Sequence, residues 1–172
     1  MLNGNDNLTV RDATEADIPA LTAIKGAGTQ TVHARRLSEA RSGNIRYLVL
    51  LLEKEPIGFC RLVLCDPVRD SHVEEPSYLP SIDDLEIKEK LRRRGYGTVF
   101  LSTIEQIATT SGFHHIYLQV EPFGNPRAYE LYQRLGYQAM QIQPYSHYWE
   151  FVDSNGNKQS GEEWVIDMVK HL

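Results

Sequence analysis

The sequence has few of the residues that build disulfides or metal sites. It contains only two cysteines, Cys60 and Cys65, which lie five residues apart in one apolar segment. An odd spacing along a strand sends two side chains to opposite faces, so we expect two free thiols and no disulfide. Neither C-x-x-C nor H-E-x-x-H occurs, and we therefore expect no bound metal.

The sequence also lacks a long apolar run and an excess of positive charge. No run approaches the length of about 18 residues that a membrane-spanning helix needs. The first seven residues are polar, without the apolar centre of a signal peptide, and we expect a flexible tail there. Free thiols without a signal peptide are typical of the cytoplasm. The net charge of −5 argues against general affinity for nucleic acid or acidic membranes.

What is present suits one globular domain over residues 1–172. The chain is 41% apolar and 24% charged, and it shows no linker and no internal repeat. A chain of this length can bury one core. Residues 66–80 have no periodicity, and a loop of this length is usually functional or mobile. Hydrophobic periodicity predicts strands at 8–13, 47–52, 57–65, 82–87, 115–120, 137–143, 148–152 and 164–169, and helices at 15–25, 31–42, 98–111 and 126–135.

The central feature is a strand followed by a glycine-bearing loop and a helix. Leu85 and Ile87 alternate with Glu86, and from Thr98 the apolar residues recur at helical spacing. Between them lies Arg92-Arg93-Arg94-Gly95-Tyr96-Gly97. Such a junction directs several unpaired backbone N–H groups, with the positive end of the helix dipole, at one point. The sequence therefore predicts a site for a pyrophosphate.

This loop alone is not specific, because a strand-turn-helix can use glycine only to turn. It is not a P-loop, since the Lys-Ser/Thr is missing, and it lacks the third glycine of the dinucleotide fingerprint. The three arginines could also form a solvated basic face or a patch for nucleic acid. The overall negative charge makes the nucleic-acid alternative the weaker one.

A second motif follows one helix and one strand later. Asn125 is a suitable N-cap with Pro126 behind it, and Gly136 closes the helix. Together with the glycine loop and Ile82–Ile87, this segment resembles the GNAT superfamily of acyl-CoA-dependent N-acetyltransferases. The resemblance covers roughly residues 82–137. It rests on the pyrophosphate loop 92–97, on a second signature made of Asn125, Ala128, Tyr132 and Gly136-Tyr137, and on a strand that lines the pantetheine arm.

The resemblance implies a fold and a cofactor. The fold would be α/β: a mixed six- to seven-stranded sheet, antiparallel in its first half and parallel at its centre, flanked by about four helices. The ligand would be acetyl-CoA as acyl donor, with coenzyme A as product and no metal. The residues implied to bind it are Leu85, Glu86 and Ile87 for the pantetheine amides, Arg92, Arg93, Arg94, Gly95, Tyr96, Gly97 and Thr98 for the pyrophosphate, and Asn125, Ala128 and Tyr129.

Tyr132 is the candidate general acid. A coenzyme A thiol resembles a cysteine thiol, with a pKa of about 8.5, and a phenol with a pKa of about 10 can donate a proton to the departing thiolate. The alternative is that Tyr132 is an aromatic residue of the core. Its position in the motif favours the catalytic role.

The base is expected at the start of the central strand. Asp83 and Asp84 lie where the thioester would be, and alternation predicts that at most one of them faces it, with Glu86 on the same face as Asp84. A carboxylate or a water could accept the proton of the amine, and all three carboxylates could equally face solvent. As a pair, Asp83 and Asp84 resemble the acidic pair of polyamine-acetylating members, which favours a cationic acceptor.

The predicted function is transfer of an acetyl group from acetyl-CoA to a primary amine by direct attack. The alternative is a coenzyme A-binding sensor or structural module without transfer. The acceptor would be a small molecule or a peptide, selected by loops at 26–36 and 66–80. We expect no nucleic-acid or membrane partner, and strands near the C-terminus could pair with a second copy to form a homodimer. The identity of the acceptor stays open.

Overall fold

The computed structural model describes residues 7–41, 43–64, 79–153 and 155–172. The expected tail at residues 1–6, Cys65 and residues 66–78 of the long loop lie outside the described residues. The described elements are β1 (Leu8–Asp12), α1 (Ile18–Lys25), α2 (Gln30–Ala40), β2 (Ile45–Leu52), β3 (Glu55–Val63), β4 (Ser81–Ile87), α3 (Tyr96–Thr110), β5 (His115–Val120), α4 (Pro126–Arg134), β6 (Gln138–Ala139), β7 (Tyr145–Val152) and β8 (Lys158–His171), with short 3₁₀ turns η1 (Glu15–Asp17) and η4 (Glu89–Leu91).

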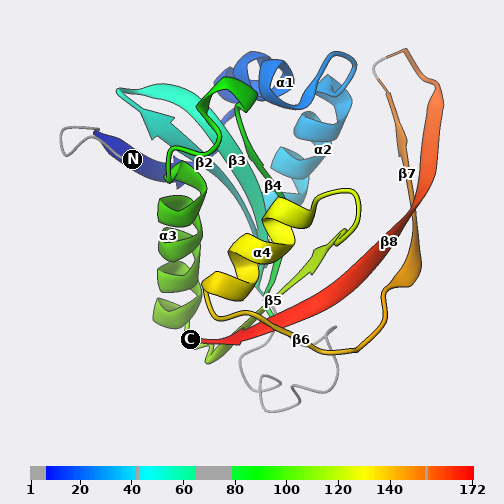
Figure 1. Cartoon of the computed structure of the whole chain (residues 1–172). Helices are drawn as coiled ribbons and strands as arrows, with labels where there is room; N and C mark the ends of the chain where they lie inside the picture. Colours follow the sequence, from blue (N-terminus) through cyan, green and yellow to red (C-terminus); the bar gives the residue numbers. More distant parts are fainter. Residues whose placement is uncertain (1–6, 42, 65–78, 154) are drawn as a thin grey trace.

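The described strands form a mixed sheet in the order β1-β2-β3-β4-β5-β8-β6, with β7 paired to β8 (Figure 1). The predicted α/β class is confirmed. The described residues form four α-helices, as expected, and a sheet of eight strands, where six to seven were expected. Among the described strands, β4 and β5 make the one parallel pair, because β8 returns antiparallel between β5 and β6. The parallel centre is therefore narrower than predicted.

The sheet has a core on each face, and β2 contributes to both. Leu48 and Leu50 belong to a cluster with residues of α3 and α4. Tyr47 and Val49 belong to a second cluster with residues of α1 and α2. Strand alternation divides the apolar run between the two faces, and this explains why β2 reads as continuously apolar. The helices cover both sides of the sheet, and none of the described ones is long and apolar enough to span a membrane.

The C-terminal strands differ most from expectation. The strand predicted at 137–143 is only Gln138–Ala139, which pairs with Met168 and Val169. The predicted hairpin is longer than expected, because β8 has 14 residues and its first half pairs with all of β7. This first half and β7 form an arm that extends beyond the main sheet and passes beside α2 (Figure 1). Periodicity underestimated the strands because both faces of the arm carry polar and aromatic residues.

A close contact between β3 and β4 fixes the position of the central strand. A Cβ added at Gly58 would lie 2.6 Å from Ile87 Cδ1 and 2.7 Å from the backbone oxygen of Glu86. Backbone cannot move aside as a flexible side chain can, so glycine allows β4 to approach β3 here.

Gly58→Ala should therefore lower the free energy of unfolding by about 1–3 kcal/mol, because the added methyl group overpacks the strand pair. Urea denaturation would measure the change. Ser102→Ala, at an exposed position of α3, is the matched control and should stay within about 0.5 kcal/mol of wild type. Equal stabilities of the two variants would contradict this account of Gly58.

Candidate active site

The candidate site begins where β4 separates from β5. The two strands pair only at Ser81 with Tyr117 and at Ile82 with Leu118. Beyond Ile82, β4 continues against β3 as far as Ile87, whereas β5 continues against β8. In the described part of the chain, the β5-side edge of β4 after Ile82 therefore has no strand partner. An extended chain such as a pantetheine arm can bind to an open strand edge of this kind.

The N-terminus of α3 lies directly after this strand. Arg93 and Gly95 have left-handed φ angles of 66° and 92°, which reverse the chain ahead of the helix. The first backbone hydrogen bond at the N-terminus of α3 is donated by the Val99 N–H to the Gly95 oxygen, at 3.1 Å. Within the described residues, no hydrogen-bond acceptor is found for the backbone N–H groups of Arg93, Arg94, Gly95, Gly97 and Thr98.

These N–H groups fit an anion. A Cβ at Gly97 would meet nothing closer than Ile87 Cγ1, at 3.9 Å. No contact with the described residues therefore requires glycine at position 97. The absence of a side chain at Gly97 leaves space next to the N–H groups that have no acceptor among the described residues. From Glu86 to Arg94 inclusive there are five basic and two acidic side chains, which add local positive charge. The helix dipole acts in the same direction.

The three arginines do not have equal roles. Arg92 turns back onto β4, where its Nε donates to the Ile87 oxygen at 2.9 Å and its Nη2 lies 3.0 Å from a Glu86 carboxylate oxygen. Arg93 and Arg94 are exposed. Arg92 therefore joins the end of the strand to the loop, and the Ile87 oxygen that it binds is one of the backbone groups expected to face the pantetheine. Arg93 and Arg94 remain the candidates for binding phosphate.

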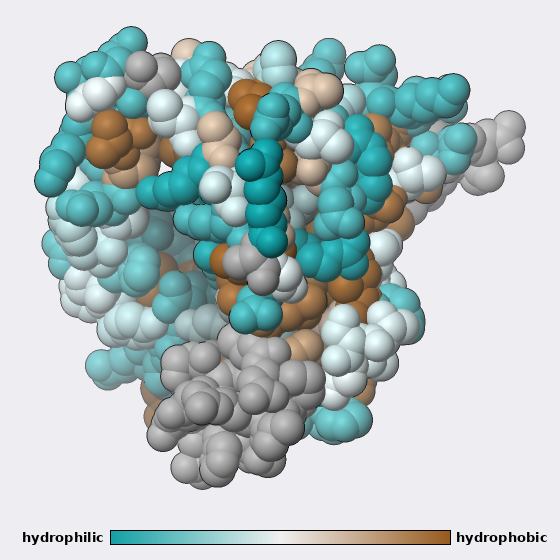
Figure 2. Space-filling model, turned by 180° about the vertical axis from the view of Figure 1, so that it is seen from behind, coloured by the Kyte–Doolittle hydropathy of each residue, from teal (hydrophilic) through white to brown (hydrophobic). Residues whose placement is uncertain are grey.

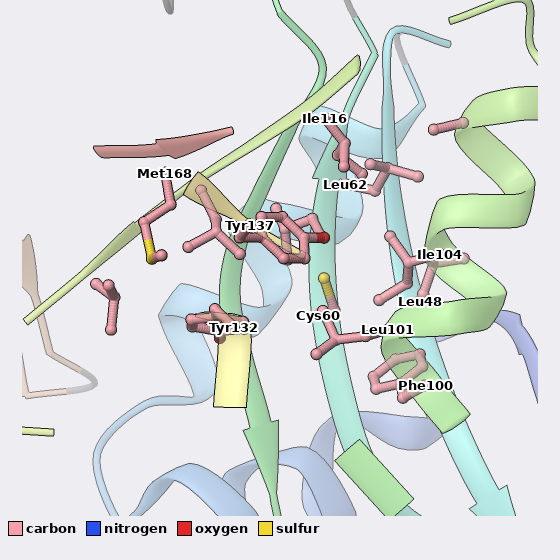
Figure 3. Close-up of a cluster of buried hydrophobic side chains, with 14 of the residues drawn as sticks. Leu48, Cys60, Leu62, Phe100, Leu101, Ile104, Ile116, Tyr132, Tyr137 and Met168 are labelled. Atoms are coloured by element: carbon pink, nitrogen blue, oxygen red, sulfur yellow. The ribbon is translucent and has the colours of Figure 1, made fainter. Parts of the chain in front are cut away.

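Tyr132 lies on α4 with its ring in the core and only 9% of its surface exposed. Figure 3 shows it beside Tyr137 and Cys60, and its ring centroid lies 5.6 Å from that of Tyr137. Burial, with smaller contributions from Cys60 and Glu86, raises the pKa of Tyr132 well above its usual value. No hydrogen-bond partner for its hydroxyl is found among the described residues. The phenol therefore stays protonated and available as a donor near neutral pH.

Asn125, Ala128 and Tyr129 form the start of the same helix. The Asn125 side chain accepts a hydrogen bond from the Ala128 N–H at 3.4 Å, as the predicted cap does. Ala128 and Tyr129 are half-buried and pack against the core on the α3 and α4 side. Capping and packing account for all three residues, so their contact with a cofactor stays a prediction.

The prediction that Asp83 and Asp84 face opposite sides is wrong, because a β-bulge interrupts the alternation. Phe59 pairs with Glu86 and Arg61 with Asp83, so that Cys60 opposes two residues of β4. Asp84 adopts a left-handed φ of 52° at this point. Cross-strand partners share a face. Glu86 therefore lies with Phe59, and Asp83 with Arg61, on the side covered by α1 and α2.

Both aspartates are paired with cations of the chain itself. Asp83 lies 2.5 Å from Arg61 Nη1 and also accepts from Ser81 at 3.1 Å. Asp84 is less exposed and pairs with Lys25 of α1, at 2.5 Å, and with Arg36 of α2. These partners could not be predicted from local patterns, because they come from three elements that only the tertiary fold brings to β4.

Arg36 packs against a buried polar network formed by Tyr47, His33 and Thr29. The guanidinium lies over the Tyr47 ring, 5.9 Å from its centroid, and the Tyr47 hydroxyl lies 2.6 Å from His33 Nδ1. His33 is fully buried, and its Nε2 lies 3.3 Å from Thr29 Oγ1. Burial, reinforced by the charges of Arg36 and Lys25, lowers the pKa of His33 to about 4. The imidazole is therefore neutral at pH 7.

The arm borders the same side of the sheet as α2. Thr31 at the start of α2 donates to the Val152 oxygen of β7 at 2.9 Å. Trp149 and Phe151 stack on the arm with centroids 6.0 Å apart. Figure 2 shows this side from behind as a largely hydrophilic surface, with a hollow between the arm and the body of the molecule. No group of three or more His, Cys, Asp or Glu side chains in the described ranges could hold a metal ion.

Comparison with protein families assigns residues 12–137 to a model described as "Acetyltransferase (GNAT) family". Comparison with curated protein sequences finds no match. The structure is similar to a mutant of the spermidine N-acetyltransferase SpeG from Vibrio cholerae, with a TM-score of 0.69 and 17% identity over 95% of this chain and 93% of that one.

Two further solved structures share the fold. A phosphinothricin acetyltransferase from Sinorhizobium meliloti, in complex with AcCoA, has a TM-score of 0.65 and 21% identity over 96% of this chain and 88% of that one. A ribosomal-protein-alanine N-acetyltransferase from Brucella melitensis has a TM-score of 0.65 and 20% identity over 95% of this chain and 99% of that one. At these identities the likeness shows the fold alone.

The buried histidine makes stability depend on pH. Its pKa is 6.5 when unperturbed and about 4 in the folded chain, so the unfolded state binds more protons between these values. The unfolding free energy should therefore fall as the pH is lowered from 6.5 towards 4, and His33→Gln should remove that part of the slope. Urea denaturation across this pH range would measure both proteins. His171→Gln, at an exposed histidine, should follow wild type; a His33→Gln slope equal to that of wild type would contradict the account.

Proposed function

The chain belongs to the acetyltransferase (GNAT) family, and on this premise we propose that it transfers an acetyl group from acetyl-CoA to a primary amine, with Tyr132 as the general acid. Members of this family are acyl-CoA N-acyltransferases. The observation that carries the proposal is the placement of unpaired N–H groups at the start of α3 directly after the open edge of β4. These features suit the two ends of one ligand, a diphosphate and a pantetheine amide chain.

The chain's own residues would hold the donor at two places. The N–H groups of Arg93, Arg94, Gly95, Gly97 and Thr98 would bind the pyrophosphate, with the exposed side chains of Arg93 and Arg94 adding charge. The open edge of β4 between Asp83 and Ile87 would bind the pantetheine amides as an added strand does. Bound there, acetyl-CoA supplies the activated acyl group as a thioester. Arg92 would serve this site indirectly, because it fastens the end of β4 to the loop.

Tyr132 would supply the proton for the departing sulfur. Its pKa is raised by burial, so the phenol remains a proton donor over the whole neutral range. A thiol with a pKa of about 8.5 leaves as a thiolate whose negative charge a nearby O–H can stabilise and then neutralise. The neighbouring Tyr137 is less suited to this role, because its hydroxyl already donates to Glu105 at 3.0 Å.

We propose that Asp84, directly or through a water, accepts the proton of the amine. Its side chain is 17% exposed, against 40% for Asp83 and 32% for Glu86. It also occupies the bulge, where β4 has lost β5 as a partner. An alkyl amine with a pKa of about 10.4 is mostly protonated at pH 7 and must lose a proton before it attacks. Asp83, which Arg61 and Ser81 hold, would then support the strand.

The acceptor is proposed only as a primary amine. Two of the structural neighbours are named for spermidine and for a ribosomal-protein alanine, and the fold therefore accommodates acceptors of very different size. The pair of aspartates that suggested a cationic acceptor is already neutralised by Lys25, Arg36 and Arg61. It gives no support for a polyamine over other amines. Of the two segments expected to select the acceptor, residues 26–36 are mostly helix and not loop, because α2 begins at Gln30, and they contribute Arg36 to this group of cations.

Tyr132→Phe should lower turnover by about 10²-fold, because it removes the proton donor while keeping the ring in the core. The affinity for coenzyme A should change little. Steady-state release of free thiol with a panel of amines would measure turnover, and calorimetric titration with coenzyme A would measure affinity. Tyr148→Phe is the matched control, since it removes a phenol that is 61% exposed on the arm.

Unchanged turnover in Tyr132→Phe would remove this residue from the mechanism. The same amine panel tests the proposed activity itself. If wild type bound coenzyme A tightly but released no thiol with any amine, the chain would be a binding module of this fold and not a transferase.

A further inference from the structure

Lys25 is an amine of the chain itself that reaches Asp84, the proposed base, on the side of β4 covered by α1 and α2, which we call the acceptor side. Lys25 is the last residue of α1, which ends at Gly26 with a φ of 129°. Its side chain passes over the Phe59 ring, with Nζ 5.9 Å from the centroid, and ends 2.5 Å from Asp84 Oδ1. Phe59 pairs with Glu86 across β3 and β4. The ammonium is therefore held against the bulge of the central strand.

The other lysines are placed differently. Lys54, Lys90 and Lys158 are exposed, and Lys170 pairs with Glu105 of α3 at 2.7 Å. Lys88 is half-buried directly after β4, where its N–H donates to the Ile57 oxygen at 2.8 Å. Among the described ion pairs, Lys25 supplies the one contact between a lysine and Asp83 or Asp84.

Lys25 and Tyr132 approach the central strand from opposite sides at the same point. The negative charge of Glu86 acts on both groups. Tyr132 comes from α4 and lies beside Cys60, the residue that faces the bulge. Lys25 comes from α1, and its ammonium group contacts Asp84, which is one of the two bulge residues of β4. The strand is therefore flanked by an amine, a carboxylate to take its proton and a phenol to protonate a leaving thiolate.

We propose that Lys25 is a site of self-acetylation, in which its ε-amine takes the acetyl group when no external acceptor is bound. This inference rests on the proposed function. The Lys25 nitrogen forms a C–N bond with the carbonyl carbon of acetyl-CoA, and the C–S bond of the thioester breaks. Asp84 accepts a proton from the amine, and Tyr132 gives one to the sulfur. The products are ε-acetyl-Lys25 and free coenzyme A.

The surroundings of Lys25 favour its neutral form more than those of a surface lysine. Burial and the charge of Arg36 lower its pKa to about 8, whereas Glu86 acts in the opposite direction. The contact with Asp84 also favours the charged form, and these are the charged groups that face the amine. A lysine with a pKa near 8 is roughly half neutral at pH 8, whereas an unperturbed one is neutral in only a few molecules per thousand.

Acetylation would change the charge of the site. An acetylated lysine carries no charge, so Asp84 would keep Arg36 as its remaining cation partner from α1 and α2. One oxygen of the carboxylate would then be released on the acceptor side. Self-acetylation therefore couples the state of the site to the supply of acetyl-CoA when acceptor is scarce.

The test is to incubate the purified full chain with acetyl-CoA alone at pH 8 and to measure acetyl occupancy of each lysine by peptide mass spectrometry. Occupancy at Lys25 should exceed that at Lys54 and Lys90 by at least about tenfold, because a held amine reacts at a high effective concentration. The rate should not depend on protein concentration. Tyr132→Phe should slow the modification by the same factor as it slows turnover with external amines.

Lys25→Arg keeps a positive charge against Asp84 and should abolish the rapid acetylation, whereas Lys54→Arg, at the exposed turn between β2 and β3, should leave it unchanged. Occupancy at Lys25 no higher than at Lys54, or a rate that rises with protein concentration, would overturn the proposal. If Lys25 stayed unmodified while external amines released thiol, self-acetylation alone would be wrong. If neither reaction occurred, the proposed function itself would fail.

Discussion

The structure depends on one interruption of hydrogen bonding, the loss of β5 as a partner of β4 after Ile82. Strand pairing normally satisfies both edges of a central strand, and a buried edge without partners is costly. Within the described residues, one edge of the central strand β4 has no strand partner after Ile82, and it leads directly to the N–H groups at the start of α3 for which no acceptor is found there. A ligand with amides at one end and a diphosphate at the other, as proposed, would satisfy both sets of groups. Gly58 and Arg92 hold β4 in place from β3 and from the loop.

The two faces of the sheet contribute different chemistry to this strand. The face covered by α3 and α4 is apolar and places Tyr132 in the core, where burial keeps the phenol protonated. The face covered by α1 and α2 carries Lys25 and Arg36 on Asp84, with neutral His33 and Tyr47 beneath them. Taking a charge into a partly buried site is costly unless a partner is present. The charges of the carboxylates and cations on this face therefore stabilise one another, and removing one charge would affect the others.

The parts of the fold that were predictable from sequence are those that local patterns encode. The strand-loop-helix at 82–111, the cap at Asn125 and the divided core of β2 follow from periodicity and capping. The bulge at Asp84 did not follow, because a left-handed aspartate has no sequence signature and reverses the predicted alternation. The partners of Asp83 and Asp84 come from α1, α2 and β3, and the insertion of β8 between β5 and β6 depends on tertiary pairing. The strand, loop and helix around Arg92–Gly97 were therefore predicted more completely than the surroundings of Asp83 and Asp84.

The proposed function requires that backbone amides at the start of α3 bind the diphosphate of the donor. Amide hydrogen exchange of the full chain, measured by NMR with and without coenzyme A, tests it most directly. The amides of Arg93, Arg94, Gly95, Gly97 and Thr98 should exchange more slowly with coenzyme A bound, while those at the exposed tip of the β7–β8 arm should be unchanged. Unaltered exchange between Arg93 and Thr98 at saturating coenzyme A would contradict it.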